Sequence, residues 1–328
     1  MTNSATLPVY QADVNNYLGP FFVLGANQTP FLNYIGGLNG YKRVLGETFP
    51  LDQYSSLEAN TTSSVVGEDD AVAGTGTTIG YTRAQHTNYI QTMLRNIQVS
   101  YKKMSEKYPL SGVAWSSSQD MLVQAELDFQ TMMNLRQIAI EMEYDCFQGA
   151  GTAPSAVTTH VATLGLVKTG SNGGIQTNRV NGAGSDSGAY TKAKIDSLVK
   201  AMADAGAPFI DPVMFVSSFG KTQISKLYGW APVAAPGAGL GGVAVEKILT
   251  DFAEIPVVFS PGALNTTVVI AEMSEMKIAG LEVPGKGAIF VEPKAKTGAS
   301  ESFQLYAQLG LDYGEQSHSG VLYGMATS

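Results

Sequence analysis

One stretch of the chain has the residue types and spacing of a phosphate-binding loop. Residues 280–287 read Gly-Leu-Glu-Val-Pro-Gly-Lys-Gly and match that motif at every position but the last. The last residue, Gly287, has no hydroxyl group to hold a magnesium ion. Residues 288–292 then read as a strand, so no helix N-terminus would face the phosphates. We therefore interpret the stretch as a turn and expect no cofactor there.

The other candidate chemistries each lack a required partner. The histidines, His86, His160 and His318, are scattered without metal-ligand spacing. Residues 184–188 read Gly-Ser-Asp-Ser-Gly, which puts an aspartate where a nucleophile elbow needs a serine. Residues 237–242 are glycine-rich but follow a proline-rich loop, so they do not predict a dinucleotide site. We expect no catalytic residues and no metal site, and hence a protein that is not an enzyme.

The composition is that of a sparsely charged globular protein. The 328 residues, enough for about two domains, are 44% hydrophobic and 15% charged, with a net charge of −8. No basic patch typical of nucleic-acid binders is evident. No signal peptide opens the chain, and no window approaches the roughly 18 apolar residues of a membrane span. The single cysteine, Cys146, cannot form an internal disulfide, so we expect a buried thiol and synthesis in a reducing cytoplasm.

Residues 46–82 form an acidic stretch without Lys or Arg. Its acidic residues are Glu47, Asp52, Glu58, Glu68, Asp69 and Asp70. We predict a long β-hairpin whose two extended legs flank a solvated acidic tip; a disordered loop is the alternative. Ordering these 37 residues costs about 40–70 kcal/mol, which takes on the order of 2,000 Å² of apolar burial to offset. Because the stretch has too little apolar content for this, an ordered hairpin needs a neighbouring subunit.

The sequence is organised around a long helix predicted over residues 117–150. Apolar side chains recur at steps of three and four along one face, at Ala125, Phe129, Met132, Leu135, Ala139, Met142 and Cys146. Glu143 falls among the polar residues of the opposite, solvated or partner-facing side. Ser117 and Asp120 resemble an N-terminal capping box, and Gly149 ends the helix. We predict a straight helix, about 45 Å long, that crosses a flat sheet, in preference to half of a coiled coil.

Strands and a compact α/β unit fill most of the remaining chain. Residues 89–101 and 303–311 alternate apolar and polar side chains, and we expect these two strands to pair beneath the long helix. Residues 149–188 form a polar connection that contains a short hairpin. The α/β unit spans residues 191–279. Its expected elements are a helix over 191–206, a strand over 213–216, a helix over 218–228, a loop over 231–242, a helical turn over 243–252 and strands over 256–259 and 268–270.

The order of these parts resembles a known architecture. Residues 1–45 hold short apolar patches that are too broken for a core of their own, so we expect an arm that lies on another surface. An arm, a hairpin, a long helix, an α/β unit and a terminal strand resemble the major capsid protein of tailed double-stranded-DNA bacteriophages, whose shape is the Hong Kong 97-type fold. The segments that carry the resemblance are Thr29-Pro-Phe-Leu-Asn-Tyr-Ile-Gly36, residues 83–91, Asp204-Ala-Gly-Ala-Pro208 and Leu309-Gly-Leu-Asp-Tyr-Gly314. The resemblance covers essentially the whole chain.

The resemblance implies an α+β capsid fold in five parts. These parts would be the N-terminal arm (1–45), the extended E-loop hairpin (46–95), the peripheral domain with spine helix 117–150 (96–190), the axial α/β domain (191–279) and strands that return to the peripheral domain (280–328). Residues 231–242 would lie near the symmetry axis of a capsomer.

The resemblance also implies a structural function. The chain would self-assemble into hexamers and pentamers of an icosahedral head that encloses double-stranded DNA without binding it specifically. Expected partners are further copies of the chain, a portal, a scaffolding protein and decoration proteins, with no membrane. The expected location is the virion, after assembly in the host cytoplasm; a separate scaffold and cleavage before residue 1 both stay open. The alternatives are an encapsulin-like compartment of the same fold and an enzyme that uses residues 191–279.

The absence of lysine from residues 44–82 bears on how copies are held together. Some relatives weld their subunits by a Lys–Asn isopeptide bond from the E-loop, so we expect non-covalent cohesion here. We expect the acidic hairpin to dock on basic positions of a neighbour, where exposed pairs, worth about 0–1 kcal/mol each, set register more than stability. The contact candidates are Glu68, Asp69, Asp70, Arg83, Arg95, Lys102, Lys103 and Lys107.

Overall fold

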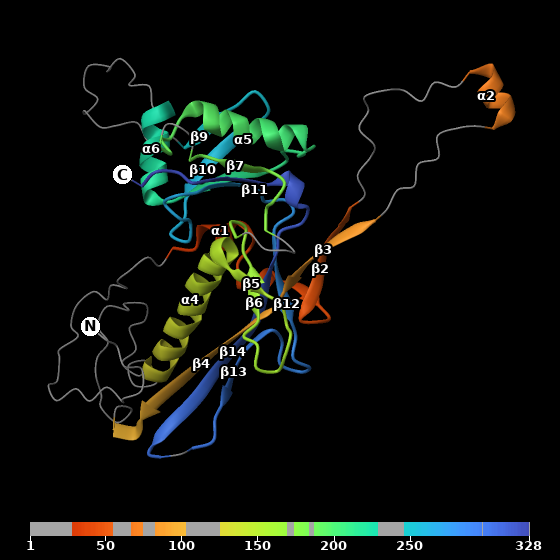
Figure 1. The fold of residues 1–328 in the computed structure, drawn as a ribbon. Coiled ribbons are helices and arrows are strands. Elements are labelled where there is room, and N and C mark those ends of the chain that lie inside the picture. Colours follow the sequence, from red (N-terminus) through yellow and green to blue (C-terminus); the bar gives the residue numbers. More distant parts are fainter. Residues whose placement is uncertain are drawn as a thin grey trace, which may run out of the picture.

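The structure, a computed structural model of the chain, contains two large β-sheets, two two-stranded sheets and a long helix in the residues that it describes (Figure 1). The residues that it describes are 28–54, 67–74, 83–102, 125–168, 174–183, 187–228, 246–296 and 298–327. The predicted capping box at Ser117 and Asp120, the loop predicted over 231–242 and most of the predicted arm lie outside these ranges.

The first sheet has five strands drawn from distant parts of the sequence. They are β1 (Lys42–Val44), β4 (Gln91–Ser100), β12 (Lys277–Leu281), β13 (Ile289–Pro293) and β14 (Ser300–Asp312). β14 pairs with β4, β12 and β13, and β1 pairs with β12. β14 runs antiparallel to β4, with Leu305 opposite Arg95 and Ala307 opposite Met93. This confirms the predicted pairing of the two alternating strands.

The long helix α4 (Ala125–Gln148) packs against β4 and β14. Its 24 residues span about 36 Å, and it ends directly before the predicted stop at Gly149. Its buried residues are Ile138, Met142, Glu143, Cys146 and Phe147. The predicted apolar face is wrong at Met132 and Leu135, which are 59% and 40% exposed, because the described buried residues of α4 lie in its C-terminal half. No helix of the described ranges is long and apolar enough to cross a membrane.

The second sheet has six strands in the order β7-β15-β11-β8-β10-β9. They are β7 (Arg179–Asn181), β8 (Pro212–Val216), β9 (Lys247–Leu249), β10 (Glu254–Phe259), β11 (Val268–Glu272) and β15 (Gly320–Tyr323). Helices α5 (Lys192–Asp204) and α6 (Ser218–Tyr228) cover one face. Met214 of β8 points to these helices, whereas Phe215 points to the opposite side, where it joins the core beneath α4. The central strand β8 is therefore buried on both faces, which explains its unbroken apolar run.

This sheet differs from the sequence expectations in two ways. Residues 247–249, predicted as part of a helical turn, form β9, in which Ile248 is buried opposite Ile255 of β10. β7 and β15 come from outside the range 191–279 that was expected to build the unit. β15 fits there because Gly320 lies against α5, where a Cβ atom would come within 2.8 Å of Leu198 Cδ1. The end of the chain therefore returns to the six-stranded sheet and not to the five-stranded one.

The predicted long hairpin is confirmed at its base and differs at its tip. β2 (Thr48–Tyr54) pairs antiparallel with β3 (Ala84–Tyr89), and the short helix α2 (Glu68–Ala73) lies between them in sequence. Asn88, which is fully buried, donates to the carbonyl oxygens of Leu164 and Leu311 at 3.1 and 2.7 Å. These bonds anchor the base of the hairpin to β14 of the five-stranded sheet and to the strand that ends at Leu164. The predicted short hairpin is also present, as β5 (Ala150–Thr152) and β6 (Ala162–Leu164).

The described part of the arm is inserted between α4 and the six-stranded sheet. Helix α1 (Pro30–Tyr34), followed by the 3-10 turn η1 (Leu38–Gly40), places the Phe31 ring 5.1 Å from that of Phe147 and 5.2 Å from that of Phe215. The segment around α1 thus lies on a surface built by other elements, as predicted for the arm.

A buried carboxylate fixes this insertion. Glu143 of α4, predicted to face solvent or a partner, is 2% exposed. Its two oxygens accept the backbone N–H groups of Phe31 and Leu32 at 3.1 and 3.0 Å, and the Ser260 hydroxyl donates to it at 2.7 Å. Burial raises the pKa of Glu143 above its ordinary value of 4.5, although these donors act in the opposite direction.

The raised pKa of Glu143 predicts a pH dependence of stability. Between pH 4.5 and the raised pKa, the folded state binds more protons than the unfolded state, so the free energy of unfolding falls as pH rises. Glu143→Gln removes this titration. We therefore expect the stability of the wild type relative to Glu143→Gln to fall from pH 4.5 upward in urea unfolding of the unassembled subunit.

The matched control is Gln137→Ala on the same helix, an exposed residue whose side chain does not titrate. This variant should keep the pH dependence of the wild type. A stability difference between wild type and Glu143→Gln that does not change with pH would refute the assignment.

Candidate functional site

The acidic residues predicted to contact a neighbour lie at the tip of the hairpin. Glu68, Asp69 and Asp70 form the first turn of α2, and the side chains of Glu68 and Asp69 are exposed. Of the basic candidates, Lys103 and Lys107 lie outside the described residues.

The described basic candidates lie in different surroundings. Arg83 is exposed immediately before β3, and Lys102 is exposed in the helical turn that follows β4. Arg95 forms an ion pair with Glu141 of α4 in the same chain, so its guanidinium group already has a carboxylate partner. Within the described part of one chain, these basic groups form no ion pair with the acidic tip.

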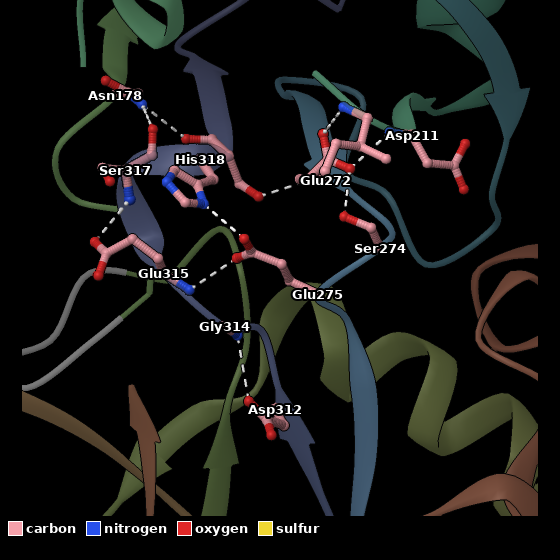
Figure 2. Close-up of polar contacts among 12 residues, drawn as sticks. Asn178, Asp211, Glu272, Ser274, Glu275, Asp312, Gly314, Glu315, Ser317 and His318 are labelled. Carbon is pink, nitrogen blue, oxygen red and sulfur yellow. Dashed lines mark hydrogen bonds and ion pairs between the residues drawn. The ribbon is translucent and has the colours of Figure 1, made fainter. Parts of the chain in front are cut away.

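The chain passes between the two sheets at a polar junction (Figure 2). One connection joins β11 to β12 through residues 273–276, and another joins β14 to β15 through residues 313–319, which include the 3-10 turn η3 (Gln316–His318). Glu275 of the first connection lies 2.7 Å from His318 Nδ1 and accepts the Glu315 N–H at 3.1 Å. One carboxylate therefore holds the two connections together.

Further buried polar groups extend this junction into the six-stranded sheet. Glu272, 1% exposed, accepts the backbone N–H groups of Ile210 and Asp211 and the hydroxyl of Ser274. Asn178 donates to two backbone carbonyl oxygens in the connection after β14. Figure 2 shows these groups around the point where the chain leaves one sheet for the other. The buried carboxylate of Glu272 is tolerated because hydrogen-bond donors surround it.

Asp312 extends the junction toward the five-stranded sheet. The Asp312 side chain is 4% exposed. Its carboxylate accepts hydrogen bonds from Lys42 Nζ at 2.7 Å and from the Gly314 N–H at 3.2 Å. Lys42 belongs to the edge strand β1, and Gly314 lies in the connection from β14 to β15. Gly314 has a φ of +62°, a left-handed conformation that glycine adopts without strain.

These junction residues were not among the candidates predicted from the sequence. Glu272 and Asp312 end strands, and Glu275 lies in a short connection between two strands. A carboxylate at the end of a buried strand is a sequence signal that could have been used. The role of the polar junction is mechanical, because it fixes the position of one sheet relative to the other.

The phosphate-loop-like stretch forms a turn, as interpreted from the sequence. Val283 and Gly287 form an isolated bridge, and Lys286 pairs with Glu292 of β13 instead of lying free for a phosphate. In the part of the chain that the structure describes, no group of three metal-ligating side chains is found.

The junction yields a prediction about stability. Glu275→Ala removes the acceptor of the Glu315 N–H and of His318, and we expect a loss of about 1–2 kcal/mol in the free energy of unfolding, since the site is partly exposed. The measurement is urea unfolding of the unassembled subunit. As a control, Glu254→Ala breaks an exposed ion pair with Lys247 and should cost about 0–1 kcal/mol. Equal losses in the two variants would contradict the role assigned to Glu275.

Solved capsid structures share this fold over nearly the whole chain. A chain of the Cyanophage A-1(L) capsid aligns with a TM-score of 0.65 and 14% identity, covering 98% of this chain and 98% of its own. The capsid of a native GTA particle gives 0.59 and 12%, covering 99% of both chains. The SrpI encapsulin of Synechococcus elongatus PCC 7942 gives 0.51 and 10%, covering 94% of this chain and 93% of its own. At these identities the likeness shows the fold alone, and it confirms the Hong Kong 97-type fold expected from the sequence.

The family comparison goes further than the fold. No curated protein matches the chain. The family described as SU10 major capsid protein matches residues 2–326, which is nearly the whole chain. The protein therefore belongs to the SU10 major capsid protein family, and its function is that of a major capsid protein.

Proposed function

We propose that copies of this capsid protein assemble without covalent links into the hexamers and pentamers of an icosahedral head that encloses double-stranded DNA. Membership of a capsid family supports self-association into a shell. The net charge of −8 supports a container that does not bind its DNA specifically, because like charges repel. The head also includes a portal, and it is assembled in the host cytoplasm with a scaffolding protein and, where present, decoration proteins.

The observation that carries the proposal is the hairpin that leaves the body of the subunit. α2 lies away from both sheets (Figure 1), and Glu68, Asp69 and Val72 are exposed there. Such a limb has little apolar burial of its own to offset the entropy lost when it is ordered. A neighbouring copy supplies the missing surface in the proposed shell.

The parts of the subunit take the roles that the family resemblance implies. The segment around α1 is the end of the N-terminal arm, β2, α2 and β3 form the E-loop, the five-stranded sheet with α4 is the peripheral domain, and the six-stranded sheet with α5 and α6 is the axial domain. The residue division differs from the expected one, because β7 and β15 add to the axial sheet. The six-stranded unit serves as a scaffold in this proposal and not as an active site.

The proposal predicts what the expressed protein forms. Negative-stain microscopy should show closed shells. For particles filled in the host, the ratio of the absorbance at 260 nm to that at 280 nm should be higher than for protein alone. The same particles treated with nuclease after opening serve as the control. Closed shells that hold protein cargo without nucleic acid would favour the compartment alternative, and a monomer or small oligomer in sedimentation would contradict the shell.

Non-covalent cohesion is tested separately. Since residues 44–82 contain no lysine, purified shells boiled in SDS should give a single band at the mass of one chain. Shells treated with glutaraldehyde on the same gel show where linked oligomers would migrate. A ladder of SDS-resistant oligomers from untreated shells would refute this part of the proposal.

A further inference from the structure

A pocket of about 450 Å³ lies between the segment around α1 and the middle of α4. Figure 1 shows these two elements side by side, and their backbones are in contact. The volume of the pocket falls within the roughly 300–1,000 Å³ that is typical of small-molecule sites. Six described residues line it, namely Gln28, Thr29, Pro30, Asn33, Arg136 and Ala139.

The wall of the pocket that comes from α1 is held in place by the core. Phe31 and Leu32 are buried, and their N–H groups donate to Glu143 at 3.1 and 3.0 Å. Thr29 and Asn33 are four residues apart, so they share one side of this short helix. The polar groups of this wall are therefore carried by a fixed backbone, which is what a binding site needs.

Among the described residues that line the pocket, only Arg136 is charged. No carboxylate lies at the spacing that forms ion pairs along a helix, because the residues three and four positions away are apolar. These neighbours are Met132, Met133, Ala139 and Ile140. Residues 28–41, which include α1, contain no charged side chain either. The pocket therefore carries a positive charge that its own walls do not compensate.

Arg136 differs in this respect from other arginines of the subunit. Arg43 forms an ion pair with Glu282, and Arg95 forms one with Glu141. Within the described residues, Arg136 forms no ion pair, and its side chain is exposed. Its guanidinium group is thus free to bind an anion that enters the pocket.

The neutral side chains of the lining favour a phosphate group as that anion. The amides of Gln28 and Asn33 and the hydroxyl of Thr29 can all donate hydrogen bonds, in addition to the fork of Arg136. A phosphate group has more acceptor oxygens than a carboxylate, so it satisfies more of these donors. Pro30 and Ala139 add an apolar surface on which a sugar can lie.

We propose that this pocket binds one backbone phosphate of the enclosed nucleic acid in each copy of the chain. Arg136 holds the phosphate oxygens, Asn33 and Gln28 donate to the same group, and the sugar lies against Pro30. Because a phosphate contact reads no base, the contact is independent of sequence, as expected for a container that does not bind its DNA specifically. This site rests on the proposed shell, because it names a contact between the shell and its contents.

Many weak contacts of this kind act together. One phosphate contact binds weakly, but a shell presents the same pocket many times to one long polymer. Each contact raises the effective concentration of the polymer at the next pocket, so the contacts strengthen one another. Inorganic phosphate has the same chemistry as the backbone group, and the experiments below separate these two sources.

The direct test is a titration of the isotope-labelled, unassembled subunit, followed by NMR. The side-chain amide signals of Gln28 and Asn33 report on the pocket and are assigned from Gln28→Ala and Asn33→Ala. Thymidine monophosphate and an oligonucleotide of thymidines should shift these signals, whereas thymidine, which has no phosphate, should not. Arg136→Gln should weaken the binding of both phosphate-bearing ligands by at least about tenfold, since hydrogen bonds from a charged group are lost.

The matched control is Arg43→Gln. The side chain of Arg43 is 67% exposed, but it already has a carboxylate partner in Glu282, so this variant should bind the oligonucleotide like the wild type. Arg136→Gln should keep the thermal unfolding midpoint of the wild type, because the side chain is exposed. Asn33→Asp is a second variant at an exposed position. Its added carboxylate repels the phosphate and should abolish binding. Unchanged binding in both pocket variants would refute the site.

Salt dependence separates nucleic acid from free phosphate. Each phosphate contact to a single strand contributes about −0.7 to the slope of log K against log salt concentration. The slope for the oligonucleotide should therefore be shallower by about 0.7 in Arg136→Gln than in the wild type. Equal slopes, together with tighter binding of inorganic phosphate than of the oligonucleotide, would assign the pocket to free phosphate and overturn the proposal. Tighter binding of a glutamate peptide than of the oligonucleotide would assign it to an acidic protein partner, with the same consequence.

The outcomes separate this site from the proposed shell. Shell formation is scored by microscopy, and the pocket is scored by titration of the unassembled subunit. If the wild type forms no shells, the proposed function fails and the role of the pocket inside a shell fails with it. If shells form and hold DNA, but the oligonucleotide does not shift the signals of Gln28 and Asn33, the shell stands and the phosphate site is refuted.

Discussion

A charged group that is buried needs hydrogen-bond donors, and in this subunit that requirement fixes the position of the arm. Removing an ionised carboxylate from water costs several kcal/mol unless donors replace the water. Glu143 obtains two donors from the backbone of α1 and one from Ser260, which follows β10. One side chain of α4 thus connects the segment around α1, the helix and the six-stranded sheet. The edge-to-face contacts of Phe31 with Phe147 and Phe215 fill the space around it. The arm is therefore a packed part of the subunit from α1 onward.

The same principle governs the junction between the sheets. Glu272, Glu275 and Asp312 lie where the chain leaves one sheet for the other, and each accepts hydrogen bonds from backbone N–H groups of the neighbouring connection. At the junction, these carboxylates accept hydrogen bonds from backbone N–H groups that have no partner in a neighbouring strand. Because several connections run through one polar junction, a shift of one sheet relative to the other must break or exchange these bonds. The two sheets are consequently coupled mechanically by this junction, in addition to the apolar core that they share.

How much the sequence could predict depended on the range of the interactions. Strict alternation identified β14 and its pairing with β4, since period and burial are local properties. The return of β15 to the six-stranded sheet could not be read, because it depends on a close approach of Gly320 to α5 that no local pattern reveals. The prediction for Glu143 is wrong because it treats charge as a sign of exposure. Glu143 lies three and four residues before the buried Cys146 and Phe147, and this spacing indicates the buried face of the helix. β9 was missed because a three-residue edge strand has no period to detect. Of the candidate contact residues, Glu68, Asp69, Arg83 and Lys102 are exposed, and Arg95 has an ion-pair partner in its own chain.

The remaining features of the subunit follow from an imbalance of burial between its parts. One core is shared by the two large sheets and α4, and a second lies between the six-stranded sheet and its helices α5 and α6; apolar side chains are excluded from water in both. By contrast, Val72 of α2 is 86% exposed, and Leu94 of β4 is 53% exposed. In the proposed shell, contact between copies covers such exposed features, in a chain with only 15% charged residues.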